Sequence, residues 1–297
     1  MEKVVLHVPV MLEEVLTYLN IIPEGIYVDA TLGTGGHSKE ILKRLKGKGL
    51  LIGFDKDIES INIAEKNLKE ISSNFILVNK SFHEIPEVLK DLNIEKVNGI
   101  LYDLGLSSFQ LEGSKRGFSF KNLDEPLDMR FSLNESLRAS DILNSYCEKA
   151  LEKIFWEYGE EPFSRKIANL IISERKKKSF EKVRDLVSLI EKNIPRRGKI
   201  HPATRIFQAL RIEVNNELKI LENSLENILP FLKEGARIIV LSYHSLEDRI
   251  VKNFLRNNES LGKIKIISKK ILKPSEEEVK RNPRARSAKM RVGEKIG

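Results

Sequence analysis

The sequence is poor in cysteine and has no long apolar run, and each shortage excludes a class of protein. Cys147 is the only cysteine, so neither an intramolecular disulfide nor a cysteine-ligated metal site can form. No apolar run approaches the roughly 18 residues that a membrane span needs. Acidic residues interrupt the first apolar stretch, which does not fit a secretory signal. We expect a cytoplasmic protein without a membrane-spanning segment.

Two motifs built on histidine and serine are also missing. The sequence contains no H-E-x-x-H zinc motif and no G-x-S-x-G nucleophile elbow. Four of the five histidines lie in separate segments without metal-ligand spacing, namely His7, His83, His201 and His244. We therefore expect no metal site and no hydrolase triad.

The composition is that of a folded, basic protein. Apolar residues make up 41% of the 297 residues and charged residues 32%, with a net charge of +8. This balance supports a sizeable core and argues against global disorder. A basic balance fits a polyanionic partner, but it fits an ordinary basic enzyme equally well.

The stretch Ile26–Ser38 (IYVDATLGTGGHS) is the feature around which the chain is organised. An apolar run ends in Asp29, and Gly33, Gly35 and Gly36 follow just before a helical pattern that begins at His37. A strand, a glycine turn and a helix in this order present backbone N–H groups to a ligand in α/β proteins. The sequence therefore predicts an α/β fold with a binding site at this turn.

Three predicted strands deliver a carboxylate at or just past their carboxyl ends. The acids are Asp29, Asp55 and Asp103. The strands predicted from apolar runs are Tyr27–Ala30, Leu50–Phe54, Phe75–Val78, Val97–Tyr102, Ala236–Ser242 and Lys263–Ser268. Because ligands bind at this edge of open parallel sheets, we expect the three acids to share one site.

The α/β rhythm stops at Leu106 and returns near His201. An irregular stretch without a clean period comes first, and helical patterns then continue to about Ile194. We predict a discontinuous sheet domain of residues 1–105 and 202–297, with an all-helical insertion of residues 106–201. Between Lys280 and Arg291 six of twelve residues are basic, so we predict a basic arm there rather than core.

The glycine turn fits two cofactors, a dinucleotide and S-adenosylmethionine. The dinucleotide fingerprint needs a third glycine where this chain has Ser38. Asp29 suits the cationic ammonium and sulfonium groups of S-adenosylmethionine better than it suits a pyrophosphate. A methyltransferase is therefore favoured over a dehydrogenase, and a non-catalytic RNA-binding protein stays open as a third interpretation.

Several separated motifs resemble one family, the bacterial small-subunit ribosomal RNA cytosine N4-methyltransferases (RsmH, also called MraW). The motifs span the chain: HVPVMLEEVL (His7–Leu16), DATLGTGGHS (Asp29–Ser38), DLGLSSFQL (Asp103–Leu111), RGFSF (Arg116–Phe120), PLDMRF (Pro126–Phe131), HPATRIFQALRIEVNNEL (His201–Leu218), SYHSLEDRIVK (Ser242–Lys252) and NPRARSAKMR (Asn282–Arg291). The resemblance implies a Rossmann-like class I S-adenosylmethionine-dependent methyltransferase sheet with an inserted helical substrate-recognition domain.

The resemblance also implies the reaction and the residues of the site. The reaction is methylation of N4 of cytidine 1402 in 16S rRNA, at the decoding centre, on the 30S subunit or a late assembly particle. The implied cofactor contacts are Gly35, Gly36, His37, Asp55, Phe82, Asp103 and Gln110. Asp103 is the catalytic candidate, because an acceptor for the N4 hydrogens would aid attack; the alternative is a cofactor contact only.

Asp103 begins the run Asp103-Leu-Gly-Leu, where many amino-methyltransferases have Asn/Asp-Pro-Pro-Tyr/Phe. The carboxylate is kept, but the groups that would hold the flipped base are not. Aromatic residues of the irregular stretch could stack on that base or merely anchor the stretch: Phe109, Phe118, Phe120 and Phe131. Basic residues that could follow phosphates, besides the tail, are Arg116, Arg130, Arg196, Arg197, Lys199 and Arg205.

Overall fold

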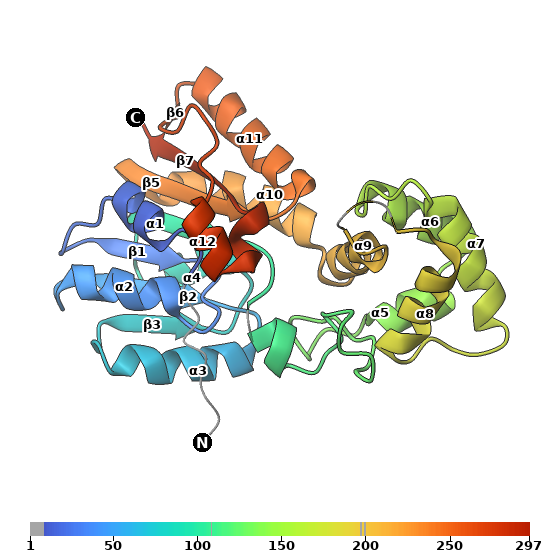
Figure 1. Cartoon of the computed structure of the whole chain (residues 1–297). Coiled ribbons are helices and arrows are strands. Elements are labelled where there is room, and N and C mark those ends of the chain that lie inside the picture. The colour runs from blue at the N-terminus through green and yellow to red at the C-terminus, as the bar shows by residue number, and fades with distance from the viewer. Residues whose placement is uncertain (1–8, 108, 197, 199) are drawn as a thin grey trace. The chain divides into compact units, whose positions relative to one another are not determined.

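The chain divides into two compact units (Figure 1). The structure is a computed structural model that describes residues 9–107, 109–196, 198 and 200–297. Met1–Gly105 and Leu218–Gly297 form one unit, which we call the sheet unit. Leu106–Glu217 form the other, which we call the helical unit.

The sheet unit is built on one seven-stranded sheet in the order β3-β2-β1-β4-β5-β7-β6. Its strands are β1 (Ile26–Asp29), β2 (Leu50–Phe54), β3 (Phe75–Val78), β4 (Val97–Asp103), β5 (Leu232–Ser242), β6 (Ile264–Ile266) and β7 (Lys289–Lys295). The first five pair in parallel, and β7 runs antiparallel to both β5 and β6. The predicted α/β fold is thereby confirmed.

The register brings the carboxyl ends of the central strands to one edge. Asp29 lies opposite Gly53 of β2 and Leu101 of β4. Asp55 lies two residues after Gly53, and Asp103 lies two residues after Leu101. The three acids lie at the same edge of the sheet because parallel neighbours end together.

Successive strand residues feed two apolar layers on opposite faces of the sheet. Leu101 and Ile239 point into one layer, whereas Ile100 and Ile238 point into the other. The first layer takes buried side chains of α1 (Leu12–Leu19), α2 (Gly36–Leu45) and α3 (Ile58–Lys69), and the second takes those of α4 (Ile85–Asp91), α10 (Glu217–Ile228) and α11 (Ser245–Ser260). Burial of these apolar faces fixes the helices on the sheet.

Residues Lys289–Lys295 form the strand β7, so the prediction of a basic arm over Lys280–Arg291 is wrong for Lys289–Arg291. Met290 and Val292 of β7 are fully buried, while Lys289 and Arg291, which alternate with them, are partly exposed. The helix α12 (Glu276–Arg281) and the 3₁₀ helix η4 (Pro283–Ser287) precede this strand. The count of basic residues hid a two-residue alternation, which is the signature of a half-buried strand.

The described residues of the helical unit form five α-helices, which pack around an apolar core of their own. They are α5 (Ala139–Ser145), α6 (Glu148–Glu157), α7 (Ser164–Arg175), α8 (Val183–Asn193) and α9 (Ala203–Asn215). The unit extends to Glu217 rather than ending at residue 201, because the buried side chains of α9, such as Ile206 and Leu210, belong to this core. Asn216, with a φ of 51°, separates α9 from α10, which begins at Glu217.

Candidate functional site

The turn between β1 and α2 requires its glycines. Gly35 has a φ of +84°, and a Cβ atom there would lie 3.3 Å from the Cβ of Ala64. A Cβ atom on Gly36 would come within 2.7 Å of Cγ of Pro9. The backbone of the turn therefore lies close to α3 and to the start of the described chain, with no room for side chains.

Asp29 stabilises this turn through hydrogen bonds to residues on both sides of its glycines. Its side chain is 2% exposed; it accepts a 2.6 Å hydrogen bond from the hydroxyl of Ser38 and a 3.2 Å bond from the backbone N–H of Thr31. Burial raises the pKa of Asp29, while the Ser38 bond opposes that shift. Ser38, which replaces the third glycine of a dinucleotide fingerprint, is thus the partner of the acid at the end of β1.

Asp55 connects the ends of β1 and β2. One carboxylate oxygen accepts a 2.8 Å bond from the N–H of Gly33, and the other a 2.8 Å bond from the N–H of Asp57. A carboxylate offers about four lone-pair sites, so acceptor positions stay available for hydroxyl groups of a ligand. Burial raises the pKa of Asp55 to about 7, against the effect of the two backbone donors.

Asp103 lies between two side chains from distant parts of the sequence. The hydroxyl of Tyr243 donates a 2.6 Å hydrogen bond to Oδ1, and Nδ1 of His37 lies 3.5 Å from Oδ2. The Asp103 side chain is 24% exposed, so it remains open to a ligand. Burial raises its pKa, whereas the charge on His37 and the Tyr243 bond both lower it.

The His37 ring connects Asp103 to the backbone of the first described residues. Its Nε2 lies 3.0 Å from the carbonyl oxygen of Val10, which can only accept, so this nitrogen carries a proton. Its Nδ1 lies 3.5 Å from Oδ2 of Asp103. The ring of His37 therefore lies between the backbone at Val10 and the carboxylate of Asp103 at the sheet edge.

Tyr243 is a site residue that the strand analysis missed. It directly follows β5, at the same edge as Asp103, and its backbone N–H donates a 2.8 Å bond to Glu247 of α11. Burial, and then the negative charge of Asp103, raise the pKa of Tyr243 well above its usual value, so it stays a donor. The strand-end rule that singled out Asp103 would have found Tyr243, had it been applied to every polar group.

Phe82 and Gln110, the other two predicted cofactor contacts, lie in different units. Phe82 begins the 3₁₀ helix η1 (Phe82–Glu84) after β3, and its ring meets Tyr102 edge-on with centroids 5.6 Å apart. Gln110 belongs to the helical unit, in the π-helix η2 (Phe109–Gly113). Its amide oxygen accepts a 3.0 Å bond from the N–H of Ser107. The sheet unit therefore unites Gly35, Gly36, His37, Asp55 and Asp103 at its edge, and Gln110 is not part of that group.

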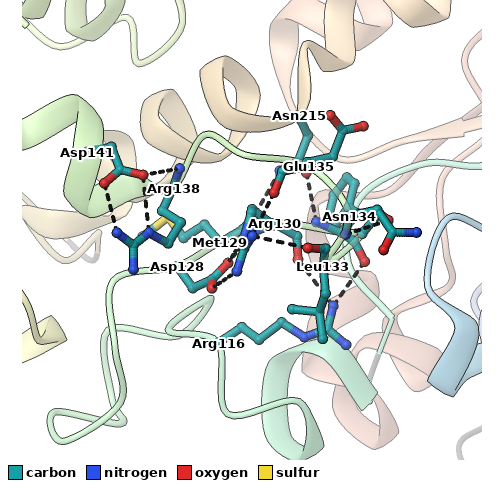
Figure 2. A network of polar contacts seen from close by, with 12 residues as sticks. Arg116, Asp128, Met129, Arg130, Leu133, Asn134, Glu135, Arg138, Asp141 and Asn215 are labelled. Carbon is teal, nitrogen blue, oxygen red and sulfur yellow. Dashed lines mark hydrogen bonds and ion pairs between the residues drawn. The ribbon is translucent and has the colours of Figure 1, made fainter.

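A polar network holds the irregular stretch of the helical unit in place (Figure 2). Arg116 is 5% exposed and donates to the carbonyl oxygens of Arg130 and Phe131. Arg130 forms a bidentate pair with Asp128, at 2.8 and 2.7 Å. Asn215 of α9 donates to the carbonyl of Met129. Arg116 and Arg130 therefore fix the stretch through bonds to protein acceptors.

Three of the four candidate stacking aromatics pack against the core of the helical unit. Phe118 stacks on Phe131 with centroids 5.7 Å apart, and Phe120 stacks on His201 at 4.6 Å. These contacts favour the anchoring interpretation. Of the remaining basic candidates, Arg196 is exposed and Arg205 donates to the carbonyl of Glu160. Arg197 and Lys199, like His7 of the first motif, lie outside the described residues.

The sheet order with its antiparallel β7, the glycine turn and the acidic edge define a Rossmann-like S-adenosylmethionine-dependent methyltransferase. Comparison with known families agrees, since the model of the MraW methylase family matches residues 4–296. The chain belongs to the MraW methylase family. This confirms the resemblance noted from its motifs.

Individual relatives match over nearly their whole length. A protein named Ribosomal RNA small subunit methyltransferase H from Dictyoglomus thermophilum is 53% identical over 290 residues, which cover 98% of this chain and 97% of the relative. Proteins of the same name match at 52% identity in Dictyoglomus turgidum (99% of both chains) and 44% in Clostridioides difficile (98% of this chain, 99% of the relative). Within the described residues, no helix is long and apolar enough to cross a membrane, and no group of acidic, histidine or cysteine side chains could hold a metal ion.

Proposed function

We propose that this protein transfers a methyl group from S-adenosylmethionine to the exocyclic N4 of cytidine 1402 in the 16S rRNA of the bacterial small subunit. Relatives that match almost end to end are named as small-subunit rRNA methyltransferases. The observation that carries the choice of an amine is Asp103, a partly exposed acceptor held between Tyr243 and His37 at the ligand edge. Ribosomal subunits assemble in the cytoplasm, so this substrate implies that compartment.

The residues of the sheet edge fit S-adenosylmethionine. The ligand carries cationic ammonium and sulfonium groups, which favour an edge with three acids. Asp55 keeps acceptor sites for the ribose hydroxyls beyond its two backbone donors. Gly35, Gly36 and His37 belong to the turn and helix start at this edge, and the ring of Phe82 is assigned to the adenine. Gln110 belongs to the helical unit, and its role as a cofactor contact rests on the family resemblance alone.

Asp103 prepares the amine for attack. The N4 lone pair of cytosine is delocalised into the ring, and one N4 hydrogen must leave as the new C–N bond forms. The bound cofactor supplies an electrophilic methyl group. Asp103 accepts a hydrogen bond from N4, which localises the lone pair, and then takes the proton. Tyr243 and His37 fix the carboxylate in the orientation that this contact needs.

Methylation of purified particles tests this proposal. The protein and labelled S-adenosylmethionine are incubated with 30S particles, with naked 16S rRNA, or with no RNA, and the RNA is digested to nucleosides. The proposal expects label in N4-methylcytidine, mapped to position 1402, with 30S particles as the better substrate. Label in another nucleoside, or none in either RNA, would overturn it.

A further inference from the structure

The helical unit exposes an aromatic side chain that its own core does not use. Trp156, near the end of α6, is 62% exposed, while its neighbours Ile154 and Phe155 are buried. It is the only tryptophan in the sequence. Large exposed aromatics are uncommon on a free surface, since they gain little from water, and they are enriched where another molecule binds.

Basic side chains surround Trp156. Lys149 and Lys153 precede it on α6 by seven and three residues, so the three lie on one face of the helix. Arg165 of α7 lines the same hollow. An adjoining hollow shares Pro162 and Arg165 and continues along α7 past Lys166. Figure 1 shows α6 and α7 together in the helical unit.

The charge on this surface is not neutralised within the described residues. Four of the side chains that line the two hollows are basic and one, Glu152, is acidic. Lys149, Lys153 and Arg165 take part in none of the ion pairs among those residues. A π-face between unpaired cations suits a ligand that offers flat rings and negative charge in alternation. A single nucleic-acid strand has that chemistry.

We propose that this surface, which we call the Trp156 face (Lys149, Lys153, Trp156, Pro162 and Arg165), binds a single-stranded segment of RNA. One base stacks on Trp156, and the three basic side chains contact the phosphates on either side. The choice of RNA rests on the proposed rRNA substrate. The Trp156 face shares no residue with those labelled in the polar network of Figure 2.

Intrinsic fluorescence tests this inference directly, because every tryptophan photon comes from Trp156. The full-length protein is titrated with 12-nucleotide oligo(U) and oligo(C), and with an RNA duplex of equal length. The proposal expects strong, saturable quenching by the single strands and little by the duplex. Unchanged fluorescence at RNA concentrations that saturate binding in a filter assay would overturn it.

Two sets of variants separate stacking from charge. Trp156→Ala should weaken oligonucleotide binding about tenfold, whereas Trp156→Phe should restore most of the loss. The double variant Lys149→Gln, Lys153→Gln should lower the slope of log affinity against log salt by about 1.4, at 0.7 per phosphate contact. The control pair Lys219→Gln, Lys233→Gln removes equal charge from exposed positions of the sheet unit and should leave the slope unchanged.

Parallel methylation assays keep this inference apart from the proposed function. If wild-type protein methylates 30S particles but RNA does not quench Trp156, only the Trp156 face is refuted. If RNA quenches Trp156 but no cytidine is methylated, only the proposed reaction is refuted. If Trp156→Ala weakens binding to 30S particles but not to the oligonucleotides, the face binds a ribosomal protein and the RNA proposal is wrong.

Discussion

The hydroxyl of Tyr243 donates a 2.6 Å hydrogen bond to Oδ1 of Asp103, although 140 residues separate the two in the sequence. β4 and β5 are parallel neighbours, so their carboxyl ends bring both residues to the edge of the sheet that carries Asp29, Asp55 and Asp103. The bond stabilises the charged form of Asp103, so Tyr243 acts as a positioning residue for the proposed acceptor.

Replacing Tyr243 by Phe should slow methyl transfer while the fold is kept. A hydrogen bond to a charged group contributes about 1.5–3 kcal/mol, so we expect the single-turnover rate to fall roughly 10- to 100-fold. The pKa of Asp103 should rise, because the lost bond had lowered it. The acidic limb of the rate–pH profile should therefore move to higher pH. If the rate falls but the acidic limb of the rate–pH profile stays at the same pH, Tyr243 contributes by packing alone.

Gly35→Ala should impair cofactor binding beyond its effect on stability. Both Gly35 and Gly47 have positive φ angles, of 84° and 70°, but a Cβ atom at Gly47 meets nothing within 4 Å. Each substitution should cost about 1–2 kcal/mol of unfolding free energy from backbone strain. Calorimetry with S-adenosylhomocysteine should show weaker binding for Gly35→Ala only. Equal affinities for the two variants would contradict the placement of the cofactor at this turn.

Asp55 should make stability depend on pH in a defined direction. Its pKa is raised from 3.8 to about 7 in the folded protein. The contribution of Asp55 to the free energy of unfolding is therefore full below pH 4 and is lost as pH rises through 7. Urea unfolding should show that the free energy of unfolding falls less between pH 5 and pH 8 for the Asp55→Asn variant than for the wild type. After allowance for partial exposure, we expect a difference of about 1–2 kcal/mol. Parallel curves would contradict the raised pKa.

Cofactor affinity should show the opposite trend with pH. Ribose hydroxyls donate to the charged carboxylate, so binding improves as Asp55 ionises. With a pKa of about 7, affinity should rise roughly tenfold between pH 6 and pH 8. Isothermal titration over this range should show the rise in the wild type and a smaller one in Asp55→Asn. An equal rise in both proteins would remove Asp55 from the ribose site.

Met290 should prove to be part of the core of the sheet unit. It is fully buried in β7, so Met290→Ala should cost about 2–5 kcal/mol of unfolding free energy. The control is Arg286→Ala, an exposed position in the basic segment just before the strand, which should change stability by less than about 0.5 kcal/mol. Denaturant unfolding distinguishes them. Equal stability of the two variants would contradict the burial of Met290 and favour the basic arm predicted from the sequence.

Most of the sheet could be predicted from local pattern. The predicted strand Leu50–Phe54 matches β2. The acid at or after each strand end sufficed to bring Asp29, Asp55 and Asp103 to one edge of the sheet. These signals are local, because strand period and turn residues depend on neighbours a few positions away.

The failures concern contacts that join distant segments. Asp103 was a candidate without partners, because the bonds to Tyr243 and His37 exist only once β1, β4 and β5 lie side by side. Arg116 likewise had no predicted partners, because the carbonyl groups of Arg130 and Phe131 come to it only through the fold of the irregular stretch. β7 forms by pairing with β5, and only this pairing shows that the alternation of apolar and basic residues in Lys289–Lys295 belongs to a strand.

The most direct test of the account is single-turnover methylation of 30S particles by Asp103→Asn at saturating S-adenosylmethionine. Asn keeps the shape of Asp but cannot take the N4 proton. The account predicts that the rate constant falls about 100- to 10,000-fold, as for loss of a general base, while cofactor affinity changes less than about threefold. A near-normal rate with near-normal affinity would contradict it and leave Asp103 as a cofactor contact only.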